Sequence, residues 1–285
     1  MNVFIKNGIL ALANVVNLDP NGWFQGHVGA SFLAGAALLK SHALSKESSR
    51  SLKSRLEKQA EKYQDLLVPL EPSEFTSDYT PIIEAIALNS QQLSRSGHGV
   101  IYGALFLKTV SSHQVRVTKK AVSNIAKLIL NGTSDKWDRY FGLDDYRQYP
   151  LPNIKVPDIK SLCALAVTRS TRDVCLDADG YFFTGEKIHG VTHAHAILLL
   201  DELGLHDLAQ KASQQLVKQL ELNELAPKSG LQFAHPKRFD LSDPTIWDIG
   251  FKDEHQIKLA YSYFELSQKL NKKLPDINHL WGAIS

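Results

Sequence analysis

The sequence predicts an all-α protein, and three observations support this fold class. Apolar residues recur at helical rather than strand spacing along most of the chain. Proline and glycine interrupt that pattern at a few places, which mark turns between helices. Almost no stretch alternates polar and apolar residues beside a hairpin turn, which argues against a substantial sheet. The interruptions fall at residues 19–22, 69–81, 149–157 and 227–244.

The first expected helix covers residues 3–17. Its apolar run, 8–18, is shorter than the ~18 residues that a membrane span needs, and no small-residue cleavage site precedes Asp19 and Pro20. A buried helix is therefore expected in place of a leader peptide. The helices after it are expected at residues 24–42, 46–67, 80–94, 97–112, 118–131, 159–174, 187–204, 206–222 and 252–270.

These helices are of two kinds. Segments 46–67, 118–131 and 206–222 carry lysine, glutamate, glutamine and serine on one face, which is typical of outer helices. Three others are apolar nearly all round and rich in glycine and alanine, which predicts buried helices with close backbone approach. These are 24–42, 97–112 and 187–204. The alternation predicts one domain over residues 1–285, an α/α barrel or toroid of helical hairpins, with a large helical bundle as the alternative.

Composition excludes several classes of function. Hydrophobic residues make up 44% of the 285 residues, enough for a sizeable core. The 32 basic and 30 acidic residues give a net charge of +2, so neither nucleic acid nor a membrane surface is expected as a partner. Cys163 and Cys175 lack zinc-type spacing and fit a reducing cytoplasm. A soluble, cytoplasmic protein with a small-molecule substrate is expected, and the oligomeric state stays open.

Histidines near the starts of the expected inner helices are the main functional signal. They are His27, His98, His189 with His193, and His255. In a toroid the first turns of the inner helices lie at one end, so histidines far apart in sequence can converge there. We predict that His27, His98, His193 and His255 face one cavity, whereas His42, His113 and His279 do not.

Imidazoles in such a cavity suit proton transfer or the binding of a polarised oxygen or a metal. His193 is the first choice for a general base, because the surrounding apolar residues 191–200 favour its neutral form. His255 is the second choice, since Asp253 and Glu254 favour its charged form. The alternative is that each histidine is a buried side chain with an ordinary hydrogen-bond partner.

A metal site has one local candidate. Glu186, His189 and His193 have the spacing of a Glu-x-x-His motif followed by a further histidine. The second Glu-x-x-His of a di-iron bundle is absent, so we expect no tightly bound metal. A partial calcium-loop pattern at 175–186 is interpreted as a turn, because its first position is Cys175.

Aromatic residues near the same turns predict a wall for a flat ligand, with ordinary core packing as the alternative. They are Trp23, Tyr102, Tyr181, Phe183, Trp247 and Tyr261. The sequence has no glycine-rich dinucleotide motif after a strand, no phosphate loop and no nucleophile elbow.

Three segments begin with or contain these histidines: residues 98–105 and 189–197, and residues 253–261, which read Asp-Glu-His-Gln-Ile-Lys-Leu-Ala-Tyr. They resemble the histidine-led helices of the questin oxidase-like family, and segment 253–261 is the most specific part of the resemblance. The resemblance implies an all-helical oxygenase that cleaves rings of aromatic polyketides by Baeyer–Villiger-type chemistry. It also implies consumption of NADPH without a bound flavin or haem.

Three functions therefore stay open. The first is an oxygenase in which cavity histidines deprotonate a phenolic substrate or handle a peroxide. The second is a metal-dependent hydrolase or oxygenase that uses Glu186, His189 and His193. The third is a non-enzymatic binder of a flat apolar ligand.

Overall fold

The chain is all-α, as the periodicity predicts. The computed structural model describes residues 2–41, 43–133, 143, 145–152, 158–174, 182–225 and 236–283, with only the backbone of 182–185. Its helices are α1 (Val3–Leu18), α2 (Gly26–Lys40), α3 (Lys46–Lys62), α4 (Thr80–Asn89), α5 (His98–His113), α6 (Lys119–Asn131), α7 (Ile159–Ser170), α8 (Phe182–Glu202), α9 (His206–Leu222), α10 (His255–Lys269) and α11 (Asn278–Ala283).

Local capping explains where several helices begin. The side chains of Ser45, Thr118 and Asp158 each accept a hydrogen bond from a backbone N–H three residues later, which satisfies a donor that the first helical turn leaves unpaired. The only strands among the described residues are two-residue segments. β1 (Phe75–Thr76) pairs antiparallel with β2 (Val117–Thr118), and Phe75 lies opposite Thr118.

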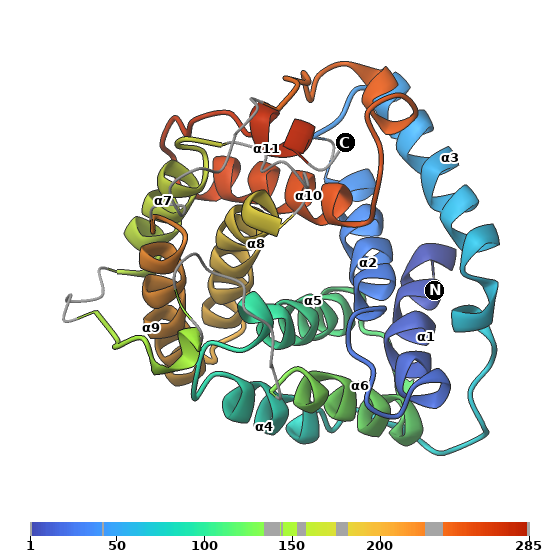
Figure 1. Cartoon of the computed structure of the whole chain (residues 1–285). Coiled ribbons are helices and arrows are strands. Elements are labelled where there is room, and N and C mark those ends of the chain that lie inside the picture. The colour runs from blue at the N-terminus through green and yellow to red at the C-terminus, as the bar shows by residue number, and fades with distance from the viewer. Residues whose placement is uncertain are drawn as a thin grey trace.

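Four helices form an inner ring. Each of α2, α5, α8 and α10 contacts two of the others, so the contacts run in a closed cycle from α2 through α5, α8 and α10 back to α2. Figure 1 shows these four around the middle of the molecule, with the remaining helices outside them. Outside the ring, α1 and α3 pack on α2, α4 and α6 pack on α5, and α7 and α9 pack on α8.

The two kinds of helix occupy the two layers. The amphipathic helices α3, α6 and α9 lie outside the ring, and the glycine- and alanine-rich helices α2, α5 and α8 lie in it. Burial follows the pattern: every residue from His98 to Leu107 is buried, whereas α3 buries Leu52 and Leu56 and exposes most of its charged residues. Of the described helices, none combines the length and apolar character needed to cross a membrane.

Candidate metal centre

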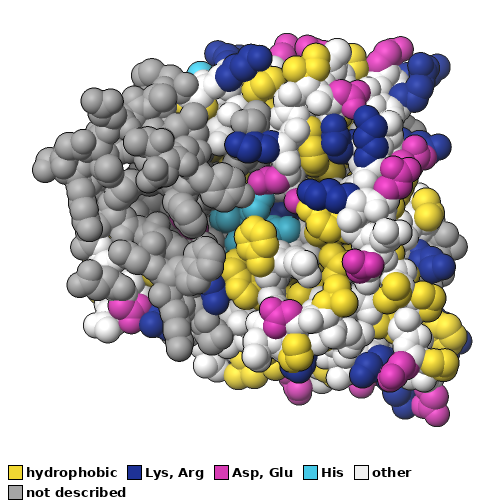
Figure 2. All heavy atoms as spheres, turned by 45° about the vertical axis from the view of Figure 1, so that its right-hand side comes forward, with side chains coloured by type: hydrophobic (Ala, Val, Ile, Leu, Met, Phe, Trp, Pro, Cys, Tyr) yellow, Lys and Arg dark blue, Asp and Glu magenta, His cyan; other side chains and the backbone are white. Residues whose placement is uncertain are grey.

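Four histidines come together at the end of the ring where α2, α5 and α10 begin. His98 and His255 are the first residues of α5 and α10, His27 is the second residue of α2, and His189 lies two turns into α8. Their relative exposures are 2% for His27, 1% for His98, 4% for His189 and 7% for His255. Figure 2 shows that histidine side chains gather in a hollow on one face of the molecule, beside hydrophobic ones.

The four rings form a square rather than a tetrahedron. In the order His27, His98, His189, His255, neighbouring ring centroids are 4.5, 4.2, 5.2 and 4.0 Å apart. The two diagonals are 6.3 and 6.4 Å. For four points on one circle, and only for these, the products of the two pairs of opposite sides add up to the product of the two diagonals. The six centroid distances satisfy this relation within rounding. The centroids therefore lie in one plane around a common centre.

The dimensions of this square match those of a transition-metal site. Each centroid lies about 3.2 Å from the centre, half the length of either diagonal. A metal–nitrogen bond of about 2.0–2.1 Å plus about 1.1 Å from the nitrogen to the ring centroid gives the same distance. One ligand nitrogen from each ring lies within 4.8 Å of those from the other three. A metal at the centre needs trans nitrogens about 4.1 Å apart, so only small inward shifts are required.

Each ring also has a partner beside its Nδ1, as metal-binding histidines usually do. The Nδ1 of His255 lies 3.0 Å from a carboxylate oxygen of Asp253, and the Nδ1 of His98 hydrogen-bonds to the backbone carbonyl of Arg95. The Nδ1 of His189 is 4.0 Å from a carboxylate oxygen of Glu186. The contacts of His98 and His255 occupy their Nδ1 atoms, which leaves their Nε2 atoms available as metal ligands.

His27 has an unusual partner, the amine of Lys258. Lys258 is 1% exposed, and burial lowers its pKa to about 7. Burial and the positive charges of its neighbours, His255 first, hold the pKa of His27 well below its ordinary value. A neutral amine can accept the Nδ1–H of His27, which leaves the lone pair of Nε2 for a metal. Among the described residues, the His27 Nε2 has no hydrogen-bond partner.

The backbone immediately before His98 is strained. Arg95, Ser96 and Gly97 have φ values of 44°, 54° and 82° in succession, immediately before α5 begins. A positive φ costs non-glycine residues conformational energy, so contacts with neighbouring residues have to stabilise it. Backbone strain of this kind is often found at functional sites. The hydroxyl of Ser96 donates to the carboxylate of Glu186. The amide of Gln219 donates to the backbone carbonyl of Ser96 at 3.3 Å.

His193 lies outside the square, and His189 takes the place predicted for it. The Nδ1 of His193 is 2.9 Å from the amide oxygen of Gln219. A Cβ on Gly97 would come within 2.5 Å of the same ring nitrogen, so the imidazole packs directly against the strained turn. Burial lowers the pKa of His193 to about 4, which keeps it neutral. Its contacts indicate that His193 supports the turn before His98, and its role as a general base stays a prediction.

Two of the predicted aromatic residues border the four histidines. The Trp23 ring lies 5.0 Å from that of His98, and the Arg95 guanidinium lies 4.5 Å from the centre of the Trp23 ring. Tyr102 lies 5.6 Å from His98 and 5.8 Å from His27. Phe24, which the sequence did not single out, is 54% exposed and lies 4.8 Å from His27. Together they form an aromatic border beside His27 and His98.

The other predicted aromatic residues lie elsewhere. Trp247 is fully buried and packs edge-on against Trp281 at 5.0 Å. Tyr261 packs against His195 and lines a cavity at the opposite end of the ring. Tyr181 and the side chain of Phe183 fall outside the described residues, as do residues 175–180 of the possible calcium loop, and the backbone of 182–185 belongs to α8.

Lys258 is the site residue that sequence reasoning missed. It follows His255 by three residues, so the two side chains share one face of α10. A lysine on the buried face of an inner helix was the available signal, because a buried lysine needs a specific partner.

No family model, curated protein or solved structure matches this chain.

Proposed function

We propose that this protein is a metal-dependent oxidoreductase of the oxygenase type, which acts on an aromatic small molecule. The observation that carries the proposal is the planar square of His27, His98, His189 and His255, with its ligand nitrogens within 4.8 Å of one another. The expectation of no bound metal rested on local spacing, which does not detect ligands from four separate helices.

The arrangement favours a redox metal over structural zinc. Structural zinc sites are closed and tetrahedral, whereas the four ring centroids of this cluster lie in one plane, which favours a metal other than structural zinc. Imidazole ligands are compatible with copper, nickel and iron, and a planar set of nitrogens is most typical of copper(II) and nickel(II). We propose iron(II) because its dioxygen chemistry fits the expected oxygenase. Such an ion, when bound, supplies one-electron chemistry with dioxygen that protein side chains lack. The resemblance to questin oxidase-like oxygenases implies oxygen chemistry as well, with NADPH and without a bound flavin or haem; the metal is an addition that rests on the four histidines alone.

The surrounding residues suit a flat aromatic substrate. Trp23 and Phe24 offer ring surfaces next to His98 and His27, and Phe24 is accessible to solvent. Burial of the histidines strengthens electrostatic interactions in the site and keeps water away from reactive species. Asp253 and Glu186 supply negative charge beside the histidines, which offsets part of the positive charge of a divalent ion.

Metal analysis of purified protein and single variants is the first test. We expect about one iron per chain after anaerobic loading with iron(II), measured by elemental analysis. His27→Gln and His255→Gln should each weaken iron binding by well over tenfold, because even partners of metal ligands contribute about 10- to 100-fold. His206→Gln is the matched control, since His206 is exposed on α9 and pairs with Asp201.

The oxygenase assignment has its own assay. Iron-loaded protein is mixed with a panel of phenolic aromatic polyketides, with and without NADPH, and dioxygen uptake is followed with an electrode. We expect uptake that depends on both iron and substrate and is lost in His27→Gln. Hydrolysis of esters by zinc-loaded protein would support the metal-dependent hydrolase in place of the oxygenase. Binding of an aromatic compound without turnover would support the non-enzymatic binder. Iron content equal in His27→Gln and wild type would overturn the metal site itself.

A further inference from the structure

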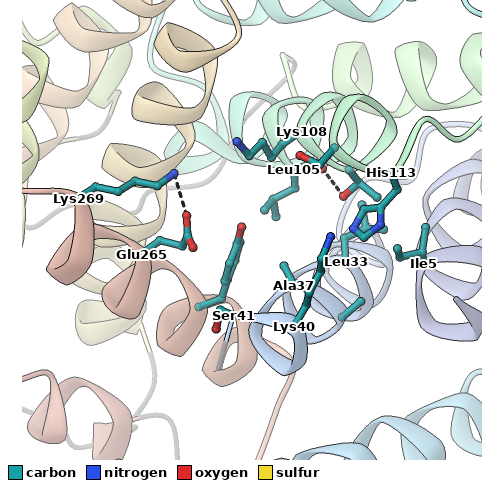
Figure 3. Close-up of a pocket in the computed structure, with 14 residues that line it drawn as sticks. Ile5, Leu33, Ala37, Lys40, Ser41, Leu105, Lys108, His113, Glu265 and Lys269 are labelled. Carbon is teal, nitrogen blue, oxygen red and sulfur yellow. Dashed lines mark hydrogen bonds and ion pairs between the residues drawn. The ribbon is translucent and has the colours of Figure 1, made fainter. Parts of the chain in front are cut away.

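A second cavity lies at the opposite end of the ring from the four histidines. Its volume is about 360 Å³, at the lower end of the size range of small-molecule sites. Figure 3 shows it between the ends of α2, α5 and α10, with Lys40, His113 and Lys269 around it. The helices α2, α5 and α10 begin at the histidines, and their last residues, Lys40, His113 and Lys269, line this cavity. The cavity therefore lies at the other end of the ring.

One wall of the cavity is electrically balanced. The amines of Lys108 and Lys269 lie 3.4 and 2.8 Å from the same carboxylate oxygen of Glu202. Lys269 also pairs with Glu265 at 2.8 Å. These two lysines and two glutamates neutralise one another, so this wall offers polar contacts without a net charge.

The opposite wall carries a positive charge that is not balanced. Among the residues that the structure describes, no carboxylate pairs with Lys40. Figure 3 shows its amine beside the imidazole of His113, with Glu265 on the other side of the cavity. Burial and then the charge of Lys40 lower the pKa of His113, which agrees with their proximity. An anion placed between Lys40 and His113 would meet two donors.

Between the charged walls the lining is apolar. Ile5, Leu33, Ala36, Ala37 and Leu105 contribute aliphatic surface from α1, α2 and α5. A ligand that fills this space therefore needs an apolar body with one anionic group at its end. Lys40 is exposed and His113 is half-buried, so the charge lies at the mouth of the cavity, next to the aliphatic lining. A positive charge at the mouth of an apolar cavity suits a carboxylate on a hydrocarbon.

We propose that this cavity is a second binding site, which takes a small amphipathic carboxylate. Its carboxylate group binds Lys40 and His113, and its hydrocarbon body packs on Leu33, Ala37 and Leu105. The site is separate from the four histidines and does not depend on the function proposed for them.

Equilibrium dialysis of the full-length protein with octanoate and with 1-octanol tests this site. The two probes share a chain length and differ in charge, so we expect octanoate to bind more tightly. Lys40→Met keeps the aliphatic stem and should weaken octanoate binding about two- to fivefold, the scale of an exposed ion pair, with little effect on 1-octanol. Ala37→Phe should abolish binding of both probes by filling the cavity. Lys53→Met is the control, since Lys53 pairs with Glu57 on the surface of α3.

Three results would overturn the proposal. They are equal binding of octanoate and 1-octanol, unchanged octanoate binding by Lys40→Met, and unchanged binding by Ala37→Phe. Lys40 lies in the last turn of α2, where it also offsets the helix dipole, so its replacement can lower stability. Ala37→Phe changes no charge, so it tests the cavity without altering the interaction with the helix dipole. Iron content measured in the same preparations should be unchanged in both variants, which separates this test from that of the metal centre.

Discussion

His195 shows what burial does to a single side chain in the inner ring. It is 1% exposed on α8, its Nδ1 lies 3.0 Å from the hydroxyl of Ser262, and its ring lies edge-on to that of Tyr261 at 4.9 Å. Burial, followed by the charges of Lys269 and Lys108, lowers its pKa to about 3. The folded protein therefore holds His195 neutral over a pH range in which the unfolded chain takes up a proton.

This difference predicts acid sensitivity. An unfolded histidine titrates near pH 6.5, so between that pH and about 3 the unfolded state binds one more proton at His195 than the folded state. The free energy of unfolding then falls as the pH falls, by about 1.4 kcal/mol per pH unit. His195→Gln keeps a polar group near Ser262 and does not titrate. From pH 7 to pH 5 it should lose about 2 kcal/mol less than wild type in urea unfolding. Parallel losses in the two proteins would show that His195 is already protonated in the folded state.

The sequence identifies the individual histidines, but it does not show which of His189 and His193 on α8 joins the other three. His189 and His193 are one turn apart on α8, so helical periodicity places both on roughly the same face. Which of the two lies beside His98 and His255 depends on the position of α9, because Gln219 on α9 hydrogen-bonds to His193. That packing is a tertiary property with no local signal.

Contact between the first two helices is set by glycine. A Cβ at Gly29 would come within 2.7 Å of the backbone nitrogen of Leu12 and 2.8 Å of the backbone oxygen of Gly8. Backbone atoms cannot move aside without moving the helix that carries them. The glycine- and alanine-rich sequence of 24–42 predicts such close approach, and the structure places it between α1 and α2.

Gly29→Ala should therefore separate α1 from α2. We expect a lower free energy of unfolding by about 1–3 kcal/mol, the usual cost of overpacking, in spite of the better helix propensity of alanine. Gly35→Ala on the same helix is the matched control, because the added Cβ would meet only side-chain atoms of Leu56, which can shift. Urea unfolding measures both variants. Equal effects would show that the backbone contact at Gly29 is not what limits the packing.

Helix ends are less predictable than helices. The expected segment 46–67 ends as an α-helix at Lys62 and continues as a short 3-10 turn at Gln64–Leu67. The expected segment 80–94 ends at Asn89, because the chain turns toward the strained residues before His98. Helix α11 was not predicted at all, since a helix of this length has almost no periodicity to detect.

For the whole molecule, the sequence predicts the helical class and the two layers because both follow from local periodicity. The square of histidines is different, since its four members come from four helices spread over residues 27–255. Their common position near helix starts predicts convergence at one end of a ring. Their coplanarity depends on how α2, α5, α8 and α10 pack, and only the structure contains that information.

The same geometry predicts that metal binding stabilises the entire fold. Each of the four inner helices contributes one ligand, and unfolding of any one of them removes that ligand from the square. An ion that binds the folded state alone adds about 2.7 kcal/mol at a free concentration one hundred times its dissociation constant. For a chain of 285 residues this corresponds to a rise of about 4–5 °C in the unfolding temperature.

Differential scanning calorimetry under anaerobic conditions, with iron(II) or with a chelator, measures this rise. We expect a single transition that moves upward as a unit with iron(II), because the ligands tie all four inner helices together. His98→Gln should remove the iron-dependent shift, and His206→Gln, which changes an exposed side chain on α9, should retain it. A shift that persists in His98→Gln would place the ion at another site. Binding of one iron with no shift in wild type would show that the unfolded chain binds the ion as tightly, which contradicts a site built from the folded ring.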